Sequence, residues 1–431
     1  MAIDLSSAVL RRSFLLLLAL IALLIVWQAS ELWFSDVELQ SGEPAKMEKA
    51  AALLPGNAEI WDRLGRYYLF NFDAPSISTA IADFQKALQV DPLSEDYWID
   101  LANAYDASGD DSAALQAYEH ARSVYPTSTL IDWNYGNFLL REGKQDDAYA
   151  AIHRAVMGTP TLLPLAMSRV WRSTGDVSQL LDRIVPADTD SYVTALNFFA
   201  SIRQVQPGIV VFDRLLALKQ PLAIGRTFEF FEELIRENDG ADARRLWNDT
   251  AASVGQPGLT ESGDSSISDG SFQLSFPNGG LGWRWAPEVG TSIDFDSSTP
   301  SGKGRSVRLD FSGGVNTDLN EPAQYLVVDP SRTYHFHASM RTDQITTDSG
   351  LAFYILDANQ NGVNYRTTNM TGTHGWTSVD LDVAIGPQTH FLCIQLSRRP
   401  STFFDNKLGG SVWIADISLV PTDAGTDRAR Q

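Results

Sequence analysis

The sequence EDYWIDLANAYDASGDDSAALQAYEHARSVYPTS, residues 95–128, decides how the rest of the chain is interpreted. Its apolar and small residues recur three and four positions apart, the spacing that places side chains on one face of a helix. Gly109 separates two such helical segments, and Pro126 ends the second. The pattern consists of Trp98, Leu101, Ala102, Tyr105, Gly109, Ala114, Tyr118, Ala121 and Pro126.

The same two-helix pattern occurs once before and once after this stretch. The preceding copy contains Trp61, Leu64, Gly65, Tyr68, Ala80, Phe84, Ala87 and Pro92. The following copy contains Tyr135, Gly136, Leu139, Gly143, Ala148, Ile152, Ala155 and Pro160. The prolines that close the copies lie 34 residues apart. A fixed period of this length indicates a repeat architecture, in which each unit buries its apolar face against its neighbours.

These copies resemble the tetratricopeptide repeat in length and in the order of their key residues. The resemblance implies an all-α solenoid that binds a protein partner. We predict a helical solenoid over residues 42–254, with clear repeats at 58–92, 95–128 and 129–162 and six degenerate-repeat helices after 162. Gly65, Ala102 and Gly136 are expected to let paired helices approach, and Tyr105 to be buried between them.

Four residues are the candidates for contact with the protein partner, because their register places them on the groove side of the first helices: Arg66, Asn103, Trp133 and Asn137. Asn103 and Asn137 share one register position, and the family resemblance implies that asparagine there can hold a peptide backbone. Trp133 would anchor a partner if it lies open in the groove. The alternative is that it packs between repeats.

The N-terminal region contains an unbroken apolar run, Phe14–Trp27, preceded by Arg11 and Arg12. Such a run is just long enough to span a bilayer, and residues 1–34 are predicted to form a cytoplasmic tail and a transmembrane signal-anchor helix. A cleaved signal peptide is the alternative, but Trp27 is too large for a cleavage motif ending at Ala29. The prediction is a single-pass protein of the bacterial inner membrane, with most of the chain in the periplasm.

The composition limits which molecules and metal sites can be expected for this chain. There are 53 acidic and 33 basic residues, a net charge of −20, which disfavours binding to nucleic acid. Cys393 is the single cysteine, so an internal disulfide and cysteine-based metal sites are excluded.

The C-terminal part changes from helical to strand periodicity. Residues 255–269 are rich in Gly, Ser, Pro and Asp and are predicted to be a linker. Beyond them Val307, Leu309 and Phe311 alternate with polar residues, and similar stretches follow, which indicates an all-β sandwich over residues 270–421. Residues 422–431 are expected to be a disordered tail. The predicted fold class is therefore multidomain: a transmembrane helix, an all-α tetratricopeptide-type solenoid and an all-β jelly-roll sandwich.

The predicted sandwich resembles the jelly-roll domains of carbohydrate-binding modules. The resemblance rests on Asp269–Phe272 with Gly282-Trp283, on Gly304–Leu309 and on Val412–Leu419. It implies binding to a polysaccharide. Family members place Glu after the opening Phe and Asp-Asp before the final strand, near a structural calcium ion. Gln273 and Ala415-Asp416 stand at these places here, so we expect no cofactor, with a structural calcium ion in the sandwich as the alternative.

Sugar recognition uses open aromatic faces together with planar polar groups. The candidate glycan-binding residues are Trp283, Trp285, Tyr325, Arg341, Tyr365, Trp376 and Arg398. For each aromatic residue the alternative is packing in the core.

Two further motifs lie on predicted strand faces. His335-x-His337 places two imidazoles on one face, half of a metal site, but no third ligand is evident nearby in the sequence. Asp380-x-Asp382 is a pair of carboxylates that is expected to be solvated.

No motif of a known catalytic class is present, and no catalytic residue is predicted. The sequence therefore favours a non-enzymatic, membrane-anchored envelope scaffold that binds protein through the repeats and glycan through the sandwich, at a site of polysaccharide assembly or export. The alternatives are a glycan-active hydrolase or lyase with a repeat adaptor, and a purely structural protein.

Overall fold

The computed structural model describes residues 8–40, 43–71, 75–360 and 362–422, without the side chains of residues 8–10, 28, 31, 32, 34–40 and 262. The first seven residues of the expected cytoplasmic tail and residues 423–431 of the expected C-terminal tail lie outside the described part. The chain divides into two compact units, Met1–Leu162 and Leu163–Gln431. The division falls inside the region predicted as one solenoid, and each unit is described by itself.

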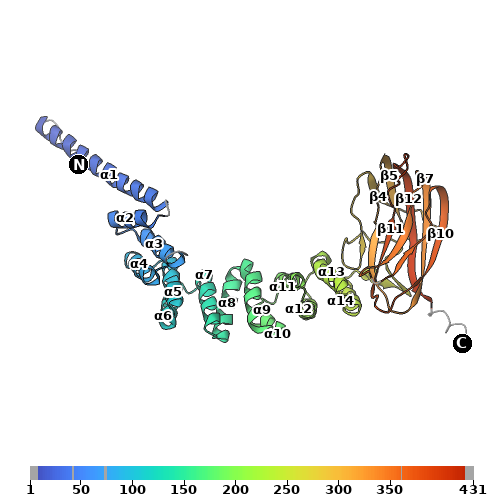
Figure 1. The fold of residues 1–431 in the computed structure, drawn as a ribbon, viewed down its shortest axis with the longest axis horizontal. Helices are drawn as coiled ribbons and strands as arrows, with labels where there is room; N and C mark the ends of the chain where they lie inside the picture. Colours follow the sequence, from blue (N-terminus) through green and yellow to red (C-terminus); the bar gives the residue numbers. More distant parts are fainter. Residues whose placement is uncertain (1–7, 41–42, 72–74, 361, 423–431) are drawn as a thin grey trace. The chain divides into compact units, whose positions relative to one another are not determined.

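In the described residues of the first unit, all regular secondary structure is helical (Figure 1). Its elements are α1 (Ala8–Gln40), α2 (Pro44–Leu53), α3 (Ala58–Phe70), α4 (Ile77–Val90), α5 (Glu95–Ser108), α6 (Asp111–Val124), α7 (Thr129–Arg141), α8 (Gln145–Gly158) and the 3₁₀ turn η1 (Pro160–Leu162).

The apolar run Phe14–Trp27 lies in α1, and most of its large side chains are exposed. Over the residues that the structure describes, no helix has both the length and the apolar character needed to cross a bilayer.

The three predicted repeats form the helix pairs α3/α4, α5/α6 and α7/α8. Each first helix begins at a capping residue whose side chain accepts a backbone N–H: Asn57, Ser94 and Ser128. Gly109 ends α5 with a φ of 79°, a left-handed conformation that glycine adopts without steric cost. The resemblance to the tetratricopeptide repeat is confirmed at the level of the fold.

The small residues of the repeats stand where two helices approach closely. A Cβ atom on Gly65 would lie 2.6 Å from the Phe84 ring, and one on Gly136 would lie 2.7 Å from Ile152. The prediction for Tyr105 is wrong in part, because its ring is only half-buried and its hydroxyl accepts a hydrogen bond from Gln85. The fully buried tyrosine of this repeat is Tyr118, on the second helix.

The third repeat differs from the first two at one position. Trp61 and Trp98 each donate from Nε1 to a proline carbonyl six residues earlier, at 2.9 Å. Asp132 occupies the position equivalent to Trp98, and its buried carboxylate is paired with Arg154 at 2.7 Å. An ion pair thus replaces the indole contact in this repeat.

The second unit begins with six helices, as expected from the helical periodicity after residue 162, and continues into strands. The helical elements are α9 (Leu163–Thr174), α10 (Val177–Arg183), α11 (Thr189–Ser201), α12 (Val205–Ala217), η2 (Ile224–Thr227), α13 (Phe228–Arg236), α14 (Gly240–Ser253) and η3 (Pro257–Leu259).

The strands form a small hairpin and two five-stranded antiparallel sheets that face each other, which confirms a β-sandwich (Figure 1). The hairpin is β1 (Glu261–Ser262) with β2 (Ser265–Ser268). One sheet, in spatial order, is β10 (Gly372–Ala384), β7 (Thr333–Ile345), β12 (Leu408–Pro421), β5 (Ser306–Val315) and β4 (Thr291–Asp296). The other is β3 (Trp283–Arg284), β6 (Ala323–Val327), β11 (Phe391–Ser397), β8 (Ala352–Asp357) and β9 (Asn364–Arg366).

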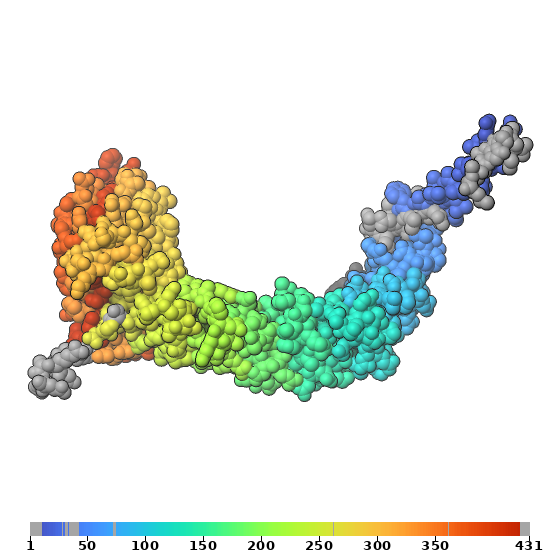
Figure 2. Space-filling model, turned by 180° about the vertical axis from the view of Figure 1, so that it is seen from behind, coloured from blue at the N-terminus to red at the C-terminus, as the bar shows by residue number. Residues whose placement is uncertain are grey.

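The expected linker at residues 255–269 is not a free connector. It contains η3, β1 and β2, and Trp247 of α14 donates from Nε1 to the carbonyl of Leu259 at 2.6 Å. Arg244 of α14 also donates to the carbonyl of Val327 in β6. Figure 2 shows the end of the helical segment directly against the sandwich. The correction has a physical cause: apolar and charged groups of α14 find partners on the sandwich, so the intervening residues become ordered.

Candidate binding surfaces

Three predicted partner-binding residues occupy equivalent positions on successive helices. Arg66, Asn103 and Asn137 each lie nine residues after the capping residue of α3, α5 and α7, respectively. We call the side of these helices that carries the three residues the first-helix face. The equivalence follows from the common period, because identical positions in stacked repeats point in the same direction.

Arg66 links the first two repeats. Its Nε lies 2.6 Å from Asp100 Oδ2 on α5 and 3.1 Å from Asp62 Oδ2 on α3. Both carboxylates are buried, while about half of the arginine side chain is exposed. Burial, and next the charge of Asp100, raises the pKa of Asp62 to about 7. Two carboxylates thus share one arginine at the boundary between the repeats.

Asn103 is held by the second helix of its own repeat. Its Oδ1 accepts a hydrogen bond from the Tyr118 hydroxyl at 2.7 Å. This contact fixes the orientation of the amide, so that Nδ2 remains as a donor for another molecule.

Asn137 is nine-tenths buried, and its Nδ2 donates to the carbonyl of Trp133 at 2.7 Å. Its Oδ1 accepts no hydrogen bond from any group that the structure describes. Because an unused buried acceptor is costly, this oxygen is suited to a donor from a bound chain. Trp133 is half-buried, so it is neither fully open in the groove nor fully packed between repeats.

One equivalent residue was missed by the sequence analysis. Asn197 lies nine residues after Asp188, the capping residue of α11 in the second unit. Its Oδ1, like that of Asn137, is buried without a hydrogen-bond donor among the described groups. Counting from the capping residue, rather than from the apolar pattern, would have identified it.

A second surface of the repeats is a hollow of about 550 Å³ between α4, α5 and α6. Trp98, Tyr105 and His120 line it, and the Trp98 and His120 rings lie 4.0 Å apart between centroids. The rest of the lining is Gln85, Leu88, Gln89, Leu101, Ala113, Gln116 and Ala117.

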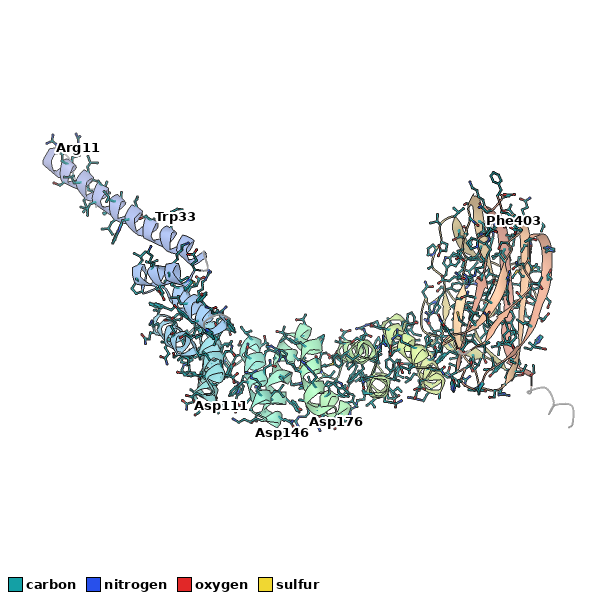
Figure 3. The ribbon with its side chains drawn as sticks, in the orientation of Figure 1. Arg11, Trp33, Asp111, Asp146, Asp176 and Phe403 are labelled. Carbon is teal, nitrogen blue, oxygen red and sulfur yellow. The ribbon has the colours of Figure 1, made fainter. Side chains whose placement is uncertain are left out.

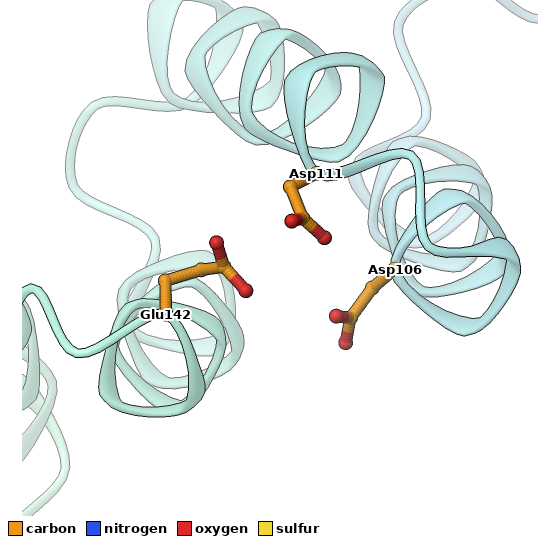
Figure 4. Close-up of side chains that lie close together, drawn as sticks. All are labelled: Asp106, Asp111 and Glu142. Atoms are coloured by element: carbon orange, nitrogen blue, oxygen red, sulfur yellow. The ribbon is translucent and has the colours of Figure 1, made fainter.

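A third feature is a group of carboxylates at the helix ends (Figure 4). Asp106, Asp111 and Glu142 each offer an oxygen within 4.8 Å of the others. Arg141 forms an ion pair with Asp106, which offsets part of the charge. Exposed acidic groups of this kind are common in a chain of net charge −20, so they do not establish a metal site.

Two of the three candidate tryptophans of the sandwich, Trp283 and Trp285, differ in burial. Trp283 is only 2% exposed, and its ring lies 5.1 Å from Phe272 and 6.1 Å from Phe276 between centroids. Its Nε1 donates to the carbonyl of Ser268. Trp283 therefore belongs to the core and has no open face for a sugar. Trp285 is half-buried against the same core.

The other aromatic candidates are half-buried and lie apart. Tyr325, on β6, carries the guanidinium of Arg284 on its ring at 4.6 Å. Tyr365, on β9, accepts a hydrogen bond from the N–H of Ala384. Trp376 lies in an irregular part of β10, in the opposite sheet. The structure does not gather these residues into one site.

Both candidate arginines have partners within the sandwich. Arg341 covers the ring of Trp413 at 4.5 Å, and Arg308 covers it at 5.2 Å. Arg398 is 1% exposed and donates to the carbonyls of Thr317, Ser349 and Asn406 and to side-chain oxygens of Asn316 and Thr347. Arg398 therefore joins loops of the sandwich, which corrects its predicted role.

The open aromatic surface of the sandwich lies at one end. Phe403, labelled in Figure 3, is 66% exposed, and Phe404 is fully exposed. Val289 is also exposed, and the next residue, Gly290, lies close to Val315. Val315 pairs with Leu408, which follows Phe403 and Phe404 in the chain. Among the described residues of the sandwich, these three are the large apolar side chains that are exposed.

The region compared with a calcium site is stabilised by internal hydrogen bonds. The carboxylate of Asp269 accepts the backbone N–H groups of Gln273 and Leu274, at 2.6 and 2.8 Å. Gln273 donates to the carbonyl of Ser271, and Asp416 accepts from Ser301. Asp269, Gln273 and Asp416 line one hollow of about 510 Å³, and both carboxylate oxygens of Asp269 already accept hydrogen bonds there.

The chain is similar to one family model and to several solved structures. A family model described as the bacterial transcriptional activator domain matches residues 69–127. No curated protein matches the chain. Among solved structures, MamA is 16% identical, with 40% of this chain and 85% of that chain covered and a TM-score of 0.26.

Two other solved structures are of similar rank. PilF of Pseudomonas aeruginosa is 18% identical, with 47% of this chain and 89% of that chain covered and a TM-score of 0.25. The enzymatically active domain of tailspike protein 4 of bacteriophage CBA120 is 15% identical, with 37% of this chain and 21% of that chain covered and a TM-score of 0.28. At these identities and TM-scores the likeness assigns neither a family nor an activity. The structure itself consists of a tetratricopeptide-like helical repeat region followed by a β-sandwich.

Proposed function

We propose that this chain is a protein-binding scaffold of the bacterial envelope and not an enzyme. The observation that carries the proposal is the placement of Arg66, Asn103 and Asn137 at equivalent positions of successive first helices. Amide side chains can donate to and accept from a peptide backbone at the same time. Two asparagines one repeat apart, preceded at the equivalent position by a guanidinium that only donates, suit an extended segment of a partner protein.

The polar contacts on this face support binding to a peptide in two ways. Asn103 is oriented by Tyr118, which reduces the entropy lost when a ligand binds. Asn137 has a buried oxygen that lacks a donor. A peptide N–H at this oxygen would remove the cost of an unpaired acceptor and would gain about 1 kcal/mol or more.

The test is a display selection of random peptides on the full-length chain, followed by affinity measurements on the selected peptides. The triple variant Arg66→Ala, Asn103→Ala and Asn137→Ala should bind them at least about 10-fold more weakly, since each lost hydrogen bond costs about 0.5–1.5 kcal/mol. Glu119→Ala, an exposed change on α6, is the control and should leave affinity unchanged. Equal affinity of the triple variant and the parent would exclude the first-helix face as the site.

The proposed location is the bacterial inner membrane, with the bulk of the chain in the periplasm. The support is the apolar run Phe14–Trp27, its exposed side chains, and the two arginines that precede it. After cell fractionation we expect the chain in the membrane fraction, and release by detergent but not by carbonate. Replacement of Leu17, Ile21 and Leu24 by Asp should move it to the soluble fraction.

Glycan binding by the sandwich is a second candidate, favoured by the open rings of Phe403 and Phe404. A role in polysaccharide assembly or export would follow from it. Retention of the full-length chain on polysaccharide affinity gels should be lost in Phe404→Ala. Release of soluble sugars during the assay would instead support the alternative of a glycan-active enzyme, and no retention would favour a sandwich that is purely structural.

A further inference from the structure

Two motifs that are far apart in the sequence meet on the outer face of the sandwich. Strands β7 and β10 pair so that Asp382 lies opposite His335 and Asp380 lies opposite His337. Because side chains alternate along a strand, these four residues share one face. The alternate residues of β7, Tyr334 and Phe336, are buried in the core. The two histidines and two aspartates therefore point to solvent, and we call them the His–Asp quartet.

The quartet is connected by short contacts. His335 Nδ1 lies 2.8 Å from Asp382 Oδ1, and its Nε2 lies 3.3 Å from Asp380 Oδ1. His337 Nδ1 lies 2.8 Å from the same Oδ1 of Asp380. Asp380 is thus within reach of both imidazoles. The Ser378 hydroxyl donates to the other oxygen of Asp380 and orients this carboxylate.

The neighbouring strand leaves the quartet without a competing charge. On the other side of β7, β12 places Ser418 opposite His337 and Val420 opposite His335. Neither residue ionises. Between 35% and 70% of each quartet side chain is exposed, so an ion can reach the group without opening the fold.

Imidazole nitrogen with carboxylate oxygen is a ligand set of Zn²⁺ and related ions. In a tetrahedral site with ligand bonds of about 2.0–2.2 Å, ligand atoms lie roughly 3.3–3.6 Å from each other. Of the observed separations, those of His335 Nε2 and His337 Nδ1 from Asp380 Oδ1, 3.3 and 2.8 Å, approach this range. Because one imidazole gives only one nitrogen to an ion, the contact of His335 Nδ1 with Asp382 would be released, and the Asp382 carboxylate would have to turn toward the ion. Because the χ2 torsion of histidine has a broad preference, each exposed ring can turn toward a common point.

We propose that His335, His337, Asp380 and Asp382 form a binding site for a divalent transition-metal ion, with Zn²⁺ as the reference ion. The two imidazoles favour such an ion over Ca²⁺ and Mg²⁺, which take oxygen ligands. The ion replaces the hydrogen bonds within the quartet and connects β10, the edge strand of its sheet, to β7. Binding to the folded state then raises the melting temperature by mass action.

The test uses the full-length chain without a polyhistidine tag, titrated calorimetrically with Zn²⁺ and, separately, with Co²⁺ followed by visible absorption. We expect Zn²⁺ binding, and Co²⁺ bands of nitrogen and oxygen coordination. In the double variant His335→Gln and His337→Gln, Zn²⁺ affinity should fall at least about 10-fold, since even groups outside the ligand set contribute that much. His374→Gln, an exposed change on β10, the strand of Asp380 and Asp382, is the matched control and should bind as the parent does.

A second variant keeps the proposal open to disproof if the double variant fails to fold. Asp380→Asn removes the oxygen shared by both imidazoles and should also lose Zn²⁺ binding and the Zn²⁺-dependent rise in melting temperature. The proposal is overturned if the parent binds no Zn²⁺ at millimolar concentration. It is equally overturned if the variants bind with the affinity and stoichiometry of the parent, which would place the ion elsewhere.

Discussion

In the first unit, Arg66 contacts Asp100 and Arg141 contacts Asp106, partners 34 and 35 residues away along the chain. In the sandwich, Arg398 contacts Thr317 and Asn316, which are 81 and 82 residues away. The first of these sequence separations equals the 34-residue repeat period, and the second differs from it by one residue. The separations in the sandwich have no relation to any period, because they depend on which loops meet at one end of two sheets.

This difference in contact pattern predicts how far the effect of a destabilising substitution should extend in each region. A repeat contacts mainly its neighbours, so the loss of one core side chain should loosen a few helices. The sandwich has one core shared by both sheets, and its loops depend on single residues that join them. A change at such a residue should therefore affect the whole domain at once.

Arg398→Ala should have the largest effect. The change leaves the carbonyls of Thr317, Ser349 and Asn406 without the donor that they share, and each unpaired buried acceptor costs about 1–3 kcal/mol. We expect the free energy of unfolding to fall by about 4–6 kcal/mol, seen in calorimetry as a lower transition of the second unit. Arg399→Ala, at the adjacent exposed arginine, should change it by less than about 0.5 kcal/mol. Similar losses for both variants would mean that the buried contacts of Arg398 contribute little.

Tyr118→Ala should have the next largest effect and a different pattern. Tyr118 is fully buried, packs against Tyr135 and Phe138 of the next repeat and holds Asn103. Its truncation should cost about 3–5 kcal/mol. Hydrogen exchange should increase in α5 to α8 and little in α2 and α3. Tyr125→Ala, an exposed tyrosine at the end of α6, is the control. Uniformly faster exchange through the whole first unit would contradict stabilisation by neighbours.

The same contrast explains what the sequence could predict. The repeats were found from Pro92, Pro126 and Pro160, because a period places each side chain against a known neighbour. In the sandwich, alternation identifies strands such as β5 but does not show which side of a strand faces the core. Trp283 and Arg398 were therefore proposed as sugar-binding residues although both are buried. The His–Asp quartet was missed for a related reason, since only the pairing of β7 with β10 brings its two motifs together.

The last prediction concerns pH and should have the smallest effect. Asp62 is 5% exposed, and burial followed by the charge of Asp100 raises its pKa from 3.8 to about 7. A raised pKa means that the folded state binds this proton more tightly than the unfolded state does. The stabilisation of the folded state by the proton on Asp62 is therefore fully present below pH 3.8 and is lost as the pH rises toward about 7. We expect the free energy of unfolding of the repeats to fall by about 1–3 kcal/mol across this window.

Asp62→Asn tests this because it keeps the shape and removes the ionisation. Denaturant unfolding of the variant should depend less on pH over the same window, although Asp100, whose pKa is also raised by burial, keeps some of the slope. In the sandwich, the pKa of His335 is raised by its hydrogen bond to Asp382, so its stabilising effect is also lost with rising pH. Because His335 is solvent-exposed, water screens this effect, and His335→Gln should leave the pH dependence of the second unit nearly unchanged. A pH slope as large in Asp62→Asn as in the parent would show that Asp62 does not hold the proton.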